Sequence, residues 1–430
     1  MRHREAAPNR TMGALTLSDW LDKLQLQHPV EIDLGLDRVS QVAAELDLLK
    51  AIPTTFTVAG TNGKGSVVEV LSSFLVGTGR SVGTYTSPHL LRFNERIRID
   101  GHEASDSDIV EAFEKIDRAR GDISLTYFEV ATLAALWIFR DRNVAVQVLE
   151  VGLGGRLDAV NIIDAEVAVV TSIGLDHIDW LGDDRGQIAV EKAGVARAGR
   201  PCVVAEGDPP ASLRERLDEI GAESLWVSSD WSVSDTHVTL SSGHDLALPP
   251  VSGLLPQNVG AAMEALYQSG LMTVDQLFTC GLAPFSVPGR LDRHLRAGLD
   301  VVMDVAHNVE SAEVLVDYLQ AQAIPGKTKA MFGVMGDKPI HDMIAACADV
   351  FDEWHLIDLS HIDRAMAVDA LADVLSGELV VARGRFEALW PAVRDGSEPG
   401  DRVVIFGSFF SVGEALSVFN AEDAAGGGGH

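Results

Sequence analysis

Short runs of β-branched and other apolar residues alternate along the chain with stretches of helical periodicity. Within residues 145–151 and 166–173 the apolar positions are nearly continuous and do not alternate with polar ones. Strands have this pattern when a parallel sheet buries both of their faces. Strands of this kind that alternate with helices predict right-handed crossovers and an α/β fold. In the first half of the chain we expect strands at 54–58, 81–86, 145–151, 166–173 and 201–205, and helices at 66–76, 127–140, 188–196 and 257–268.

The pattern changes twice in the rest of the chain. Between residues 211 and 254 it becomes short and polar, which predicts a small antiparallel addition with strands at 226–229, 236–240 and 245–248. Prolines, a glycine and several arginines in residues 284–298 then indicate a linker. A second series of strands and helices follows, with strands expected at 301–305, 330–333, 354–358, 379–381 and 403–406. We therefore expect a larger α/β domain of about 290 residues followed by a smaller one of about 130.

The chain has 430 residues, and its 34 Lys and Arg against 63 Asp and Glu give a formal net charge of −29. This acidity argues against binding to nucleic acid or to anionic membranes, because both rely on Lys and Arg. It does not exclude an anionic small ligand, since a binding site is local and net charge is global. Cys202, Cys280 and Cys347 fit neither a disulfide framework nor a zinc site. With no visible secretory signal and no apolar run of membrane-spanning length, we expect a soluble cytoplasmic protein.

Residues 54–66 (TTFTVAGTNGKGS) predict a strand, a glycine turn and a helix. Glycines let backbone N–H groups close around phosphate oxygens, the helix N-terminus adds its dipole, and Lys64 adds a positive charge. The spacing departs from G-x-x-x-x-G-K-[ST], because Val58 replaces the first glycine and Gly65 separates Lys64 from Ser66. The alternative is a glycine turn that binds nothing. The flanking strand and helix favour binding of ATP or GTP, with Ser66 able to offer its hydroxyl to a metal ion.

Acidic, hydroxyl and imidazole side chains follow the ends of other predicted strands, where open α/β sheets bind their ligands. Glu150 ends an apolar strand and is placed to hold the metal ion of a nucleotide, since Mg²⁺ prefers oxygen ligands. His177 follows Asp176, and taken alone it fits a structural residue better than a ligand. Ser87 begins a Ser-Pro turn, and Lys192 is by default a solvated helix lysine. The residues therefore indicate an enzyme that uses a magnesium nucleotide, without indicating its reaction.

Longer motifs occur in order along most of the chain, between Leu17 and Leu416. They are residues 60–66 (GTNGKGS), 85–90 (YTSPHL), 94–96 (NER), 149–158 (LEVGLGGRLD), 171–177 (TSIGLDH), 191–194 (EKAG), 289–290 (GR), 304–308 (DVAHN) and 407–408 (GS). With these motifs the chain resembles the bifunctional dihydrofolate synthase/folylpolyglutamate synthase family of the Mur ligase superfamily. The resemblance implies a large P-loop-type parallel-sheet domain at 1–290 that binds ATP and pterin, a linker at 291–298, and a smaller Rossmann-like glutamate-ligase domain at 299–420. We expect residues 421–430, which include four consecutive glycines, to be a flexible tail.

The chemistry implied by the resemblance is ATP-dependent amide ligation. A carboxylate of dihydropteroate or of a folate attacks the γ-phosphate of MgATP, and the amino group of L-glutamate then attacks the resulting acyl phosphate. Phosphorylation gives the carboxylate a leaving group, while Mg²⁺ and Lys64 neutralise the charge on the transferring phosphoryl group. The partners implied are dihydropteroate, folates, L-glutamate and ATP. The protein itself is expected to be a monomer.

The resemblance also assigns residues around the nucleotide. Two magnesium ions are implied, the first bound by Ser87 and Glu150 and the second by His177. Lys192 matches a lysine that is carbamylated in the family, which turns a cation into a carboxylate-like group. Lys64, His177 and Lys192 would therefore be catalytic. The residues that would bind ATP are Thr61, Asn62, Gly63, Lys64, Gly65, Ser66, Asn258, Arg290 and Asp304.

Substrate-binding segments are implied as well. For the pterin they are Ile32, Asp33, Leu34, Thr126, Tyr127, Phe128, Glu129, Leu157, Asp158 and Ala159, and for the incoming glutamate His307 and Ser408. Asp33 or Asp158 could accept hydrogen bonds from the pterin amino group, and Phe128 could pack on the ring. Without the resemblance, Tyr127 and Phe128 fit core residues at the start of a helix. Val160 and Val305 depart from the family pattern, which often has Thr and Gly there, and they affect only local packing and backbone geometry.

Other interpretations are a monofunctional folylpolyglutamate synthase, another Mur-type amino-acid ligase, and a non-enzymatic nucleotide switch. The segment around Asp33 and residues 126–129 argue against a ligase that acts on a cell-wall precursor. The set of residues that fits a metal site, together with a second α/β domain that supplies Arg290 and Asp304, argues against a switch.

Overall fold

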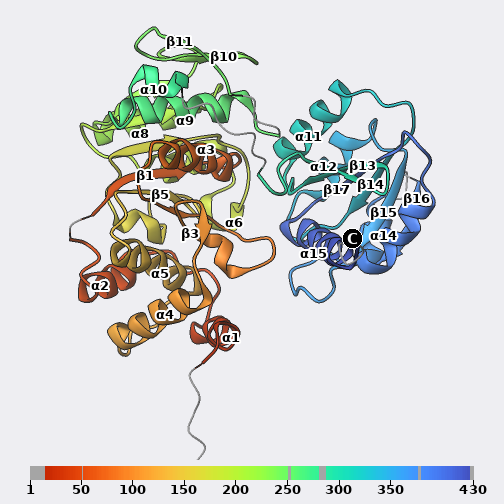
Figure 1. Cartoon of the computed structure of the whole chain (residues 1–430), viewed down its shortest axis with the longest axis horizontal. Helices are drawn as coiled ribbons and strands as arrows, with labels where there is room; N and C mark the ends of the chain where they lie inside the picture. The colour runs from red at the N-terminus through yellow and green to blue at the C-terminus, as the bar shows by residue number, and fades with distance from the viewer. Residues whose placement is uncertain (1–14, 51, 250–252, 280–286, 376–378, 427–430) are drawn as a thin grey trace, which may run out of the picture.

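The structure, a computed structural model, describes residues 15–50, 52–249, 253–279, 287–375 and 379–426. Its strands form sheets of eight, three and six strands within these ranges. The eight-stranded and six-stranded sheets lie in separate halves of the molecule (Figure 1). We call the described residues up to 279 the large unit and those from 287 onward the small unit.

The sheet of the large unit is mostly parallel. Its strand order is β4-β3-β2-β5-β1-β6-β7-β8, and only β3 and β4, at one edge, are antiparallel to their neighbours. In β1, Thr54 lies opposite Val146 and Phe56 lies opposite Val167, so the three central strands end at one edge. This confirms the predicted α/β class. The strands are β1 (Thr54–Ala59), β2 (Val82–Tyr85), β3 (Ile97–Ile99), β4 (His102–Glu103), β5 (Val146–Glu150), β6 (Val167–Val170), β7 (Pro201–Val204) and β8 (Glu223–Trp226).

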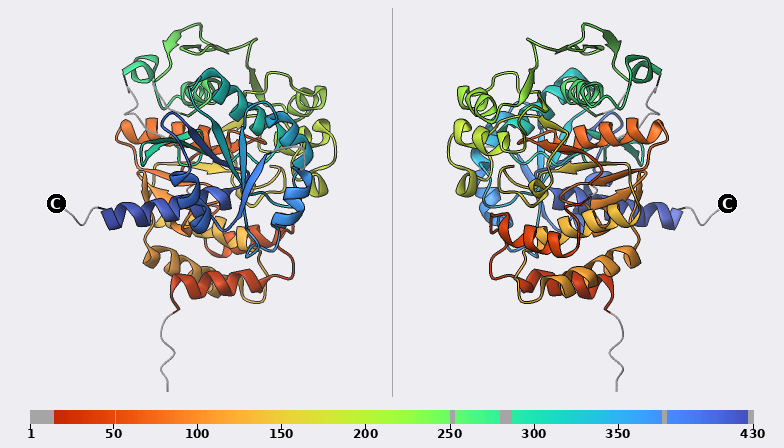
Figure 2. Two further views of the ribbon diagram at one scale, coloured as in Figure 1. Left: turned by 90° about the vertical axis from the view of Figure 1, so that its right-hand side faces the viewer. Right: turned by 90° about the vertical axis from the view of Figure 1, so that its left-hand side faces the viewer.

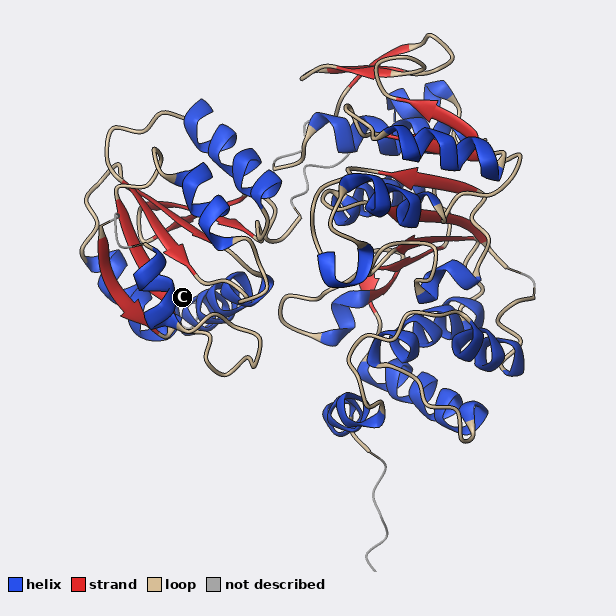
Figure 3. Cartoon of the chain, turned by 180° about the vertical axis from the view of Figure 1, so that it is seen from behind, coloured by secondary structure: helices blue, strands red, loops and turns tan. Residues whose placement is uncertain are grey.

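Helices cover both faces of this sheet, which explains the continuous apolar strands (Figure 3). On one face α3 and α9 pack together beneath the three-stranded sheet, around Phe74 and Trp231. On the other face α5 packs on the sheet and α4 packs on α5, around Phe113 and Trp137. The helices are α1 (Leu17–Gln27), α2 (Asp37–Glu45), α3 (Lys64–Gly77), η1 (Phe93–Arg96), α4 (Asp106–Arg120), α5 (Tyr127–Asp141), η2 (Ala159–Ile162), α6 (Ile178–Leu181), α7 (Arg185–Ala193), α8 (Ala211–Ile220), α9 (Pro256–Gln268) and α10 (Val274–Thr279).

In the described part of the chain the small antiparallel addition has three strands, as many as predicted, but one of the three was predicted in the wrong place. Its strands are β9 (Ser232–Val233), β10 (His237–Thr239) and β11 (Asp245–Ala247), so the predictions at 236–240 and 245–248 are confirmed. The prediction at 226–229 is wrong, because the strand there is β8, which pairs in parallel with β7 at the edge of the large sheet. An edge strand keeps one side in solvent, which accounts for its more polar sequence.

The small unit contains a six-stranded sheet in the order β12-β13-β17-β14-β15-β16, parallel except for the β12–β13 pair. Helices α11, α12 and α13 pack on one face, and α14 and α15 pack on the other. Figure 2 shows α15 extending past the edge of the unit toward the C-terminus. The elements are β12 (Asp292–Arg296), β13 (Leu299–Asp304), α11 (Val309–Ala321), β14 (Thr328–Phe332), α12 (Ile340–Cys347), β15 (Glu353–Ile357), α13 (Val368–Val374), β16 (Val380–Gly384), α14 (Phe386–Asp395), β17 (Arg402–Phe406) and α15 (Phe409–Gly426).

Two expectations about the connecting segments are corrected. Residues 292–296, expected in the linker at 291–298, form β12 and pair with β13. Arg293 and Leu295 are exposed and alternate with more buried positions, as in an edge strand with one face in solvent. Residues 421–426, expected in the flexible tail at 421–430, continue α15. Glu422 accepts a hydrogen bond from Trp390 Nε1 (3.1 Å), and Asp423 pairs with Arg296, so the helix is held against its neighbours. The glycines at 427–430 lie outside the described residues.

Two further sequence expectations concern cysteines and membranes. Cys202 and Cys347 are buried free thiols, and burial raises the pKa of each to about 12. Cys280 lies outside the described residues. None of the helices in the described ranges is long and apolar enough to cross a membrane.

Candidate active site

A cavity of about 310 Å³ lies between the two units, a size typical of small-molecule sites. Its walls come from the β1–α3 loop, the segments that follow β5 and β6, helices α7 and α9, and residues 290–314 with Phe409 of the small unit. The topology therefore brings the carboxyl ends of the central strands to face a second unit. The sequence-predicted residues that line the cavity are Thr61, Asn62, Gly63, Lys64, Ser66, Ser87, Glu150, His177, Lys192, Asn258, Arg290, Asp304 and His307. Gly65 and Ser408 are not among the lining residues, nor are the predicted pterin-binding residues.

The phosphate loop depends on glycine at two positions. Gly63 has a φ of 85° and caps α3, and a Cβ atom there would lie 2.6 Å from Asn258 Oδ1. A Cβ atom at Gly60 would lie 1.7 Å from Thr171 Oγ1. Any other residue at either position would displace the backbone or its neighbours. The loop therefore packs tightly while α3 begins at Lys64 with its N-terminus toward the cavity, the arrangement that favours an anion.

Thr61 and Asn62 connect this loop to other parts of the cavity wall. The Thr61 hydroxyl donates to Gly174 O (3.1 Å) and accepts from Gly174 N (2.9 Å). The side-chain amide of Asn62 exchanges two hydrogen bonds, each 3.1 Å, with the amide of Asn308 in the small unit. The amide pair thus ties the phosphate loop directly to the small unit.

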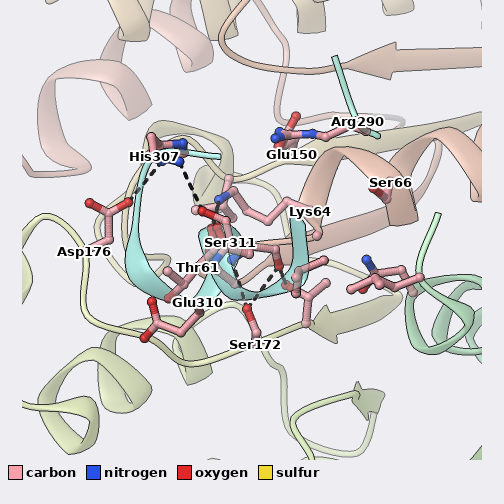
Figure 4. A pocket seen from close by; sticks show the side chains of 18 of the residues that line it. Thr61, Lys64, Ser66, Glu150, Ser172, Asp176, Arg290, His307, Glu310 and Ser311 are labelled. Atoms are coloured by element: carbon pink, nitrogen blue, oxygen red, sulfur yellow. Dashed lines mark hydrogen bonds and ion pairs between the residues drawn. The ribbon is translucent and has the colours of Figure 1, made fainter. Parts of the chain in front are cut away.

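Lys64 lies folded over the loop. Its ammonium donates to Gly60 O (3.0 Å) and Thr61 O (3.1 Å), and Figure 4 shows it in the middle of the cavity. Burial lowers the pKa of Lys64, while the negative charge of Glu150 acts in the opposite direction. A phosphate group would relieve this cost of burial by giving the ammonium a counter-ion.

Glu150 and Ser87 occupy the wall beside Lys64. The Glu150 carboxylate is buried and accepts a hydrogen bond from Ser87 N (3.0 Å), which brings the two predicted metal ligands together. Burial raises the pKa of Glu150, and the positive charge of Lys64 acts against this. A buried carboxylate with few donors is the kind of group that a cation stabilises.

His177 differs in chemistry from these oxygen donors. It takes a left-handed backbone conformation (φ 53°) as the residue that precedes α6, and burial lowers its pKa to about 4. The imidazole is therefore neutral near pH 7, the form that binds metals. Within the described ranges, His, Cys, Asp and Glu side chains do not gather in threes around a point that could hold a metal ion. Of the predicted metal ligands, Glu150 supplies a carboxylate, His177 an imidazole, Ser87 a hydroxyl and Lys192 an amine.

Lys192 is a buried lysine. It lies on α7 with 3% of its surface exposed, and among the described residues no carboxylate lies within 4.0 Å of its ammonium. Burial, together with the charge of Lys64, lowers its pKa to about 7. The loop after β5 approaches α7 so closely that a Cβ atom at Gly155 would lie 2.8 Å from Glu191 O. This contact places Lys192 against the cavity, so the expectation of a solvated lysine is wrong.

Asp176 connects the two units. Its Oδ1 lies 2.6 Å from Lys338 Nζ and its Oδ2 lies 3.4 Å from His307 Nε2, both in the small unit (Figure 4 shows the His307 contact). Burial alone would raise the pKa of Asp176, but the hydrogen bond from His307 and the charges of His177 and Lys338 hold it well below its usual range. Sequence analysis placed Asp176 at a strand end without a role and missed Lys338 entirely, because nothing in its local sequence indicates a partner across the cavity.

Arg290 and Asp304 enter the cavity from the small unit. Arg290 lies over the ring of Phe409, 5.2 Å from its centroid, and burial lowers its pKa while Asp304 and Glu150 act in the opposite direction. The Asp304 carboxylate accepts hydrogen bonds from Leu291 N and Ala306 N, each 2.7 Å. Asp304 therefore also fixes the backbone next to Arg290.

The predicted pterin segments lie behind the loop that follows β5. The ring of Phe128 fills the space where a Cβ atom at Gly152 would lie, 2.5 Å from Phe128 Cζ. The buried Asp158 accepts hydrogen bonds from Leu153 N (2.8 Å) and Val160 N (3.0 Å), and burial raises its pKa to about 6. Thr126 and Glu129 cap the start of α5. The side chain of each accepts a hydrogen bond from the backbone N–H of the other, so both have a structural role. Residues 151–154 line the cavity, and this loop thus separates the segments from it.

Ser408 and the segment around Asp33 complete the predicted set. Ser408 is buried, and its hydroxyl lies 2.8 Å from Ser411 Oγ and accepts from Ser411 N at the start of α15. Asp33 is half-exposed and pairs with Arg38 (2.7 Å), a residue that sequence analysis missed. Ile32 and Leu34 are partly buried beside it, while Leu157 and Ala159 adjoin Asp158 at η2.

The fold and the cavity first indicate the class of enzyme to which the chain belongs. Two α/β units enclose a phosphate loop, and residues 289–409 match the family model described as Mur ligase, glutamate ligase domain. The fold and the site are therefore those of a Mur-type ligase.

Comparison with relatives identifies which family of Mur-type ligases the chain belongs to. The chain is 42% identical to the dihydrofolate synthase/folylpolyglutamate synthase of Escherichia coli (strain K12), over 96% of this chain and 98% of the relative. It superposes on Escherichia coli FolC in complex with DHPP and ADP with a TM-score of 0.90, at 40% identity and 95% and 99% coverage. For the Yersinia pestis enzyme complexed with AMPPNP and Mn ion the TM-score is 0.88, at 41% identity and 96% and 100% coverage. The chain belongs to the dihydrofolate synthase/folylpolyglutamate synthase family.

Proposed function

We propose that this chain is an ATP-dependent ligase that adds L-glutamate to dihydropteroate, forming dihydrofolate, and to folates, forming folylpolyglutamates. The observation that carries the proposal is one cavity in which the phosphate loop and buried Glu150 face Arg290 and His307 of a second unit. The solved relatives agree with this: Escherichia coli FolC was found with DHPP and ADP, and another bifunctional enzyme with Mn, AMPPNP and L-glutamate. ATP and a divalent metal ion are therefore the ligands we assign to the cavity.

The reaction takes two steps. A carboxylate oxygen of the pteroate or folate attacks the γ-phosphorus, the bond from that phosphorus to the bridging oxygen breaks, and ADP leaves with an acyl phosphate formed. The amino nitrogen of glutamate then attacks the acyl carbon, the bond to the phosphate oxygen breaks, and phosphate leaves as the amine loses a proton. The ammonium of Lys64 and the N-terminus of α3 stabilise the charge on the transferring phosphoryl group.

The residues beside Lys64 fit magnesium. When bound, Mg²⁺ would supply positive charge to the phosphate oxygens. We propose two ions, the first held by Ser87 and Glu150 and the second by His177 with Lys192. The oxygen donors of the first pair suit Mg²⁺. For the second, the low pKa of His177 keeps its imidazole in the neutral, metal-binding form.

Carbamylation would convert Lys192 into a ligand. The neutral amine attacks the carbon of CO₂, and a nitrogen–carbon bond forms as one C=O π bond breaks and its electron pair moves onto oxygen. The nitrogen then releases a proton, which leaves a carbamate anion on a formerly cationic side chain. The burial of Lys192, its missing counter-ion among the described residues and its pKa of about 7 all favour this modification, because they favour the neutral amine.

We assign the substrates to two sides of the cavity. The pterin would bind behind residues 151–154, with Asp158 and Asp33 as acceptors for its amino group and Phe128 against its ring. Residues 32–34, 126–129 and 157–159 form this region. The incoming glutamate would bind on the small unit near His307. Ser408 would act there through the start of α15, since its own hydroxyl is already bonded to Ser411.

Three broader features belong to the same proposal. We place the boundary between the ATP- and pterin-binding domain and the glutamate-ligase domain near residue 290, where the family model also begins, at 289. A reducing, cytoplasmic location fits the free thiols of Cys202 and Cys347. That the chain acts as a monomer stays a prediction, which light scattering of the purified protein tests.

The experiment is ADP release by the purified protein with MgATP and L-glutamate, with dihydropteroate or tetrahydrofolate added in separate reactions. Stimulation by both substrates supports the bifunctional ligase. Stimulation by tetrahydrofolate alone selects the monofunctional enzyme. Nucleotide binding without stimulation by either substrate contradicts the proposal and favours a nucleotide switch.

A further inference from the structure

Residues 28–36 (HPVEIDLGL) form a loop without regular secondary structure, which we call the Asp33 loop. In the part of the chain that the structure describes, residues 29–35 take part in no backbone-to-backbone hydrogen bond. A segment of this length without backbone bonds samples many conformations unless side chains restrain it, because ordering each residue costs conformational entropy. The position of Asp33 therefore depends on its side-chain contacts.

Arg38, the second residue of α2, provides the main contacts. Its Nη1 lies 2.7 Å from Asp33 Oδ2, and its Nη2 donates to Asp33 O (2.7 Å) and to Glu129 Oε1 (3.2 Å). The guanidinium thus holds both the side chain and the backbone of Asp33, as a rigid planar fork can and a lysine cannot. His28 adds a weaker contact, with Nε2 3.3 Å from Asp33 Oδ2.

The other partner of Arg38 is already fixed. Glu129 is buried, and its second carboxylate oxygen accepts the backbone N–H of Thr126 (2.7 Å) at the start of α5. Arg38 therefore joins the Asp33 loop, which among the described residues has no backbone-to-backbone hydrogen bonds at residues 29–35, to the capped start of α5, which adjoins Phe128. Contacts of α2 with α5 and with η2 place the same helix against the third segment, which carries Asp158.

We propose that Arg38 is a positioning residue that holds the Asp33 loop against the start of α5 and so forms the binding site for the pterin end of the substrate. This inference rests on the proposed function and deepens it, because it explains how three segments distant in sequence form one site. Arg38 itself contacts none of the reacting groups. Its loss would force the substrate to order the loop on binding, which weakens binding without changing the chemistry at Lys64.

The test compares steady-state ADP release by the wild-type protein and Arg38→Met, with MgATP and L-glutamate saturating and dihydropteroate varied. We expect the KM for dihydropteroate to rise at least about tenfold, the weakening that the loss of a charge-assisted contact produces. The kcat and the KM for ATP should stay within about twofold of wild type. Arg38→Lys should recover only part of the loss. Arg118→Met is the matched control, since Arg118 on α4 pairs with Glu114 (2.9 Å) at an exposed position.

A double variant separates positioning from general stability. If Arg38 acts through Asp33, Arg38→Met combined with Asp33→Asn should raise the KM no further than the more severe single variant. Multiplicative effects, or an unchanged KM for dihydropteroate in Arg38→Met, would overturn the inference. If Arg38→Met does not fold, Arg38→Lys is compared with wild type under the same criteria. A wild-type protein that dihydropteroate does not stimulate would instead refute the proposed function.

Discussion

The ammonium of Lys338 in the small unit lies 2.6 Å from Oδ1 of Asp176 in the large unit, and both side chains are buried. Asp176 directly precedes His177, so this ion pair connects the relative position of the two units to a proposed metal ligand. His307 approaches the other oxygen of the same carboxylate, and Glu310 of the small unit accepts a hydrogen bond from Leu175 N (3.3 Å), so the small unit contacts this wall of the cavity around Asp176. We therefore expect domain closure and metal binding to be coupled.

Replacement of Lys338 tests this coupling. In Lys338→Met the carboxylate of Asp176 loses its lysine partner and keeps the weaker contacts with His177 and His307. Loss of one member of a buried pair costs about 3–5 kcal/mol. We expect the KM for MgATP to rise by about tenfold or more and the radius of gyration from X-ray scattering to increase. Lys327→Met serves as the control, because Lys327 pairs with Glu353 (2.6 Å) at an exposed position of the small unit. An unchanged KM and an unchanged radius of gyration would contradict the coupling.

The low pKa of Lys192 predicts that the activation of the enzyme by CO₂ depends on pH. After CO₂ is removed, activity should return on addition of a fixed concentration of CO₂, at a rate that follows the neutral fraction of the amine. An amine is neutral above its pKa, so with a pKa of about 7 the rate should rise about tenfold from pH 6 to pH 8 and then level off. Stopped assays of ADP release at each pH measure this rate.

The variant Lys192→Ala provides the complementary observation. It should lose nearly all turnover while its thermal unfolding midpoint changes little, and a short carboxylic acid should restore part of the activity. Wild-type activity that does not depend on CO₂ would exclude a carbamate at this position. Full activity of Lys192→Ala would exclude it as well.

Glu150→Gln tests the first metal site. The amide keeps the size of the side chain and can still accept the hydrogen bond from Ser87 N, so the fold should remain intact. Loss of the negative charge should shift the magnesium concentration for half-maximal activity upward by about tenfold or more. Circular dichroism checks the fold, and a magnesium titration that matches wild type would argue against the role of Glu150.

Gly152→Ala probes the wall between the cavity and the pterin region. The added methyl group would lie 2.5 Å from Phe128 Cζ, so the ring must move. We expect a rise of about fivefold or more in the KM for dihydropteroate, with the KM for ATP nearly unchanged. Gly77→Ala in α3 serves as the control, because its added methyl group lies in open space. Gly101→Ala would be an unsuitable control, because Gly101 has a positive φ that strains an added side chain.

Local patterns predicted the parallel sheet and the phosphate loop, whereas Asn258, Arg290, Asp304 and His307 were assigned to the site only through the family resemblance. Continuous apolar strands predicted the sheet, and the glycine turn before Lys64 predicted the anion site. Residues that act through distant partners gave no such signal: Lys338 and Arg38 look like ordinary surface residues until the fold brings Asp176 and Asp33 to them. The strand at 292–296 was missed for a related reason, since a charged edge strand and a linker share their composition, and only the pairing with β13 distinguishes them.

The central claim is that the carboxylate of the substrate is phosphorylated by ATP before glutamate attacks it. Dihydropteroate labelled with ¹⁸O in its carboxylate tests this directly, with mass spectrometry of the released phosphate after a single turnover with ATP and L-glutamate. Because the attacking carboxylate oxygen stays on phosphorus when the acyl–oxygen bond breaks, the account predicts one ¹⁸O atom in each phosphate formed. Unlabelled phosphate accompanied by labelled dihydrofolate would contradict it.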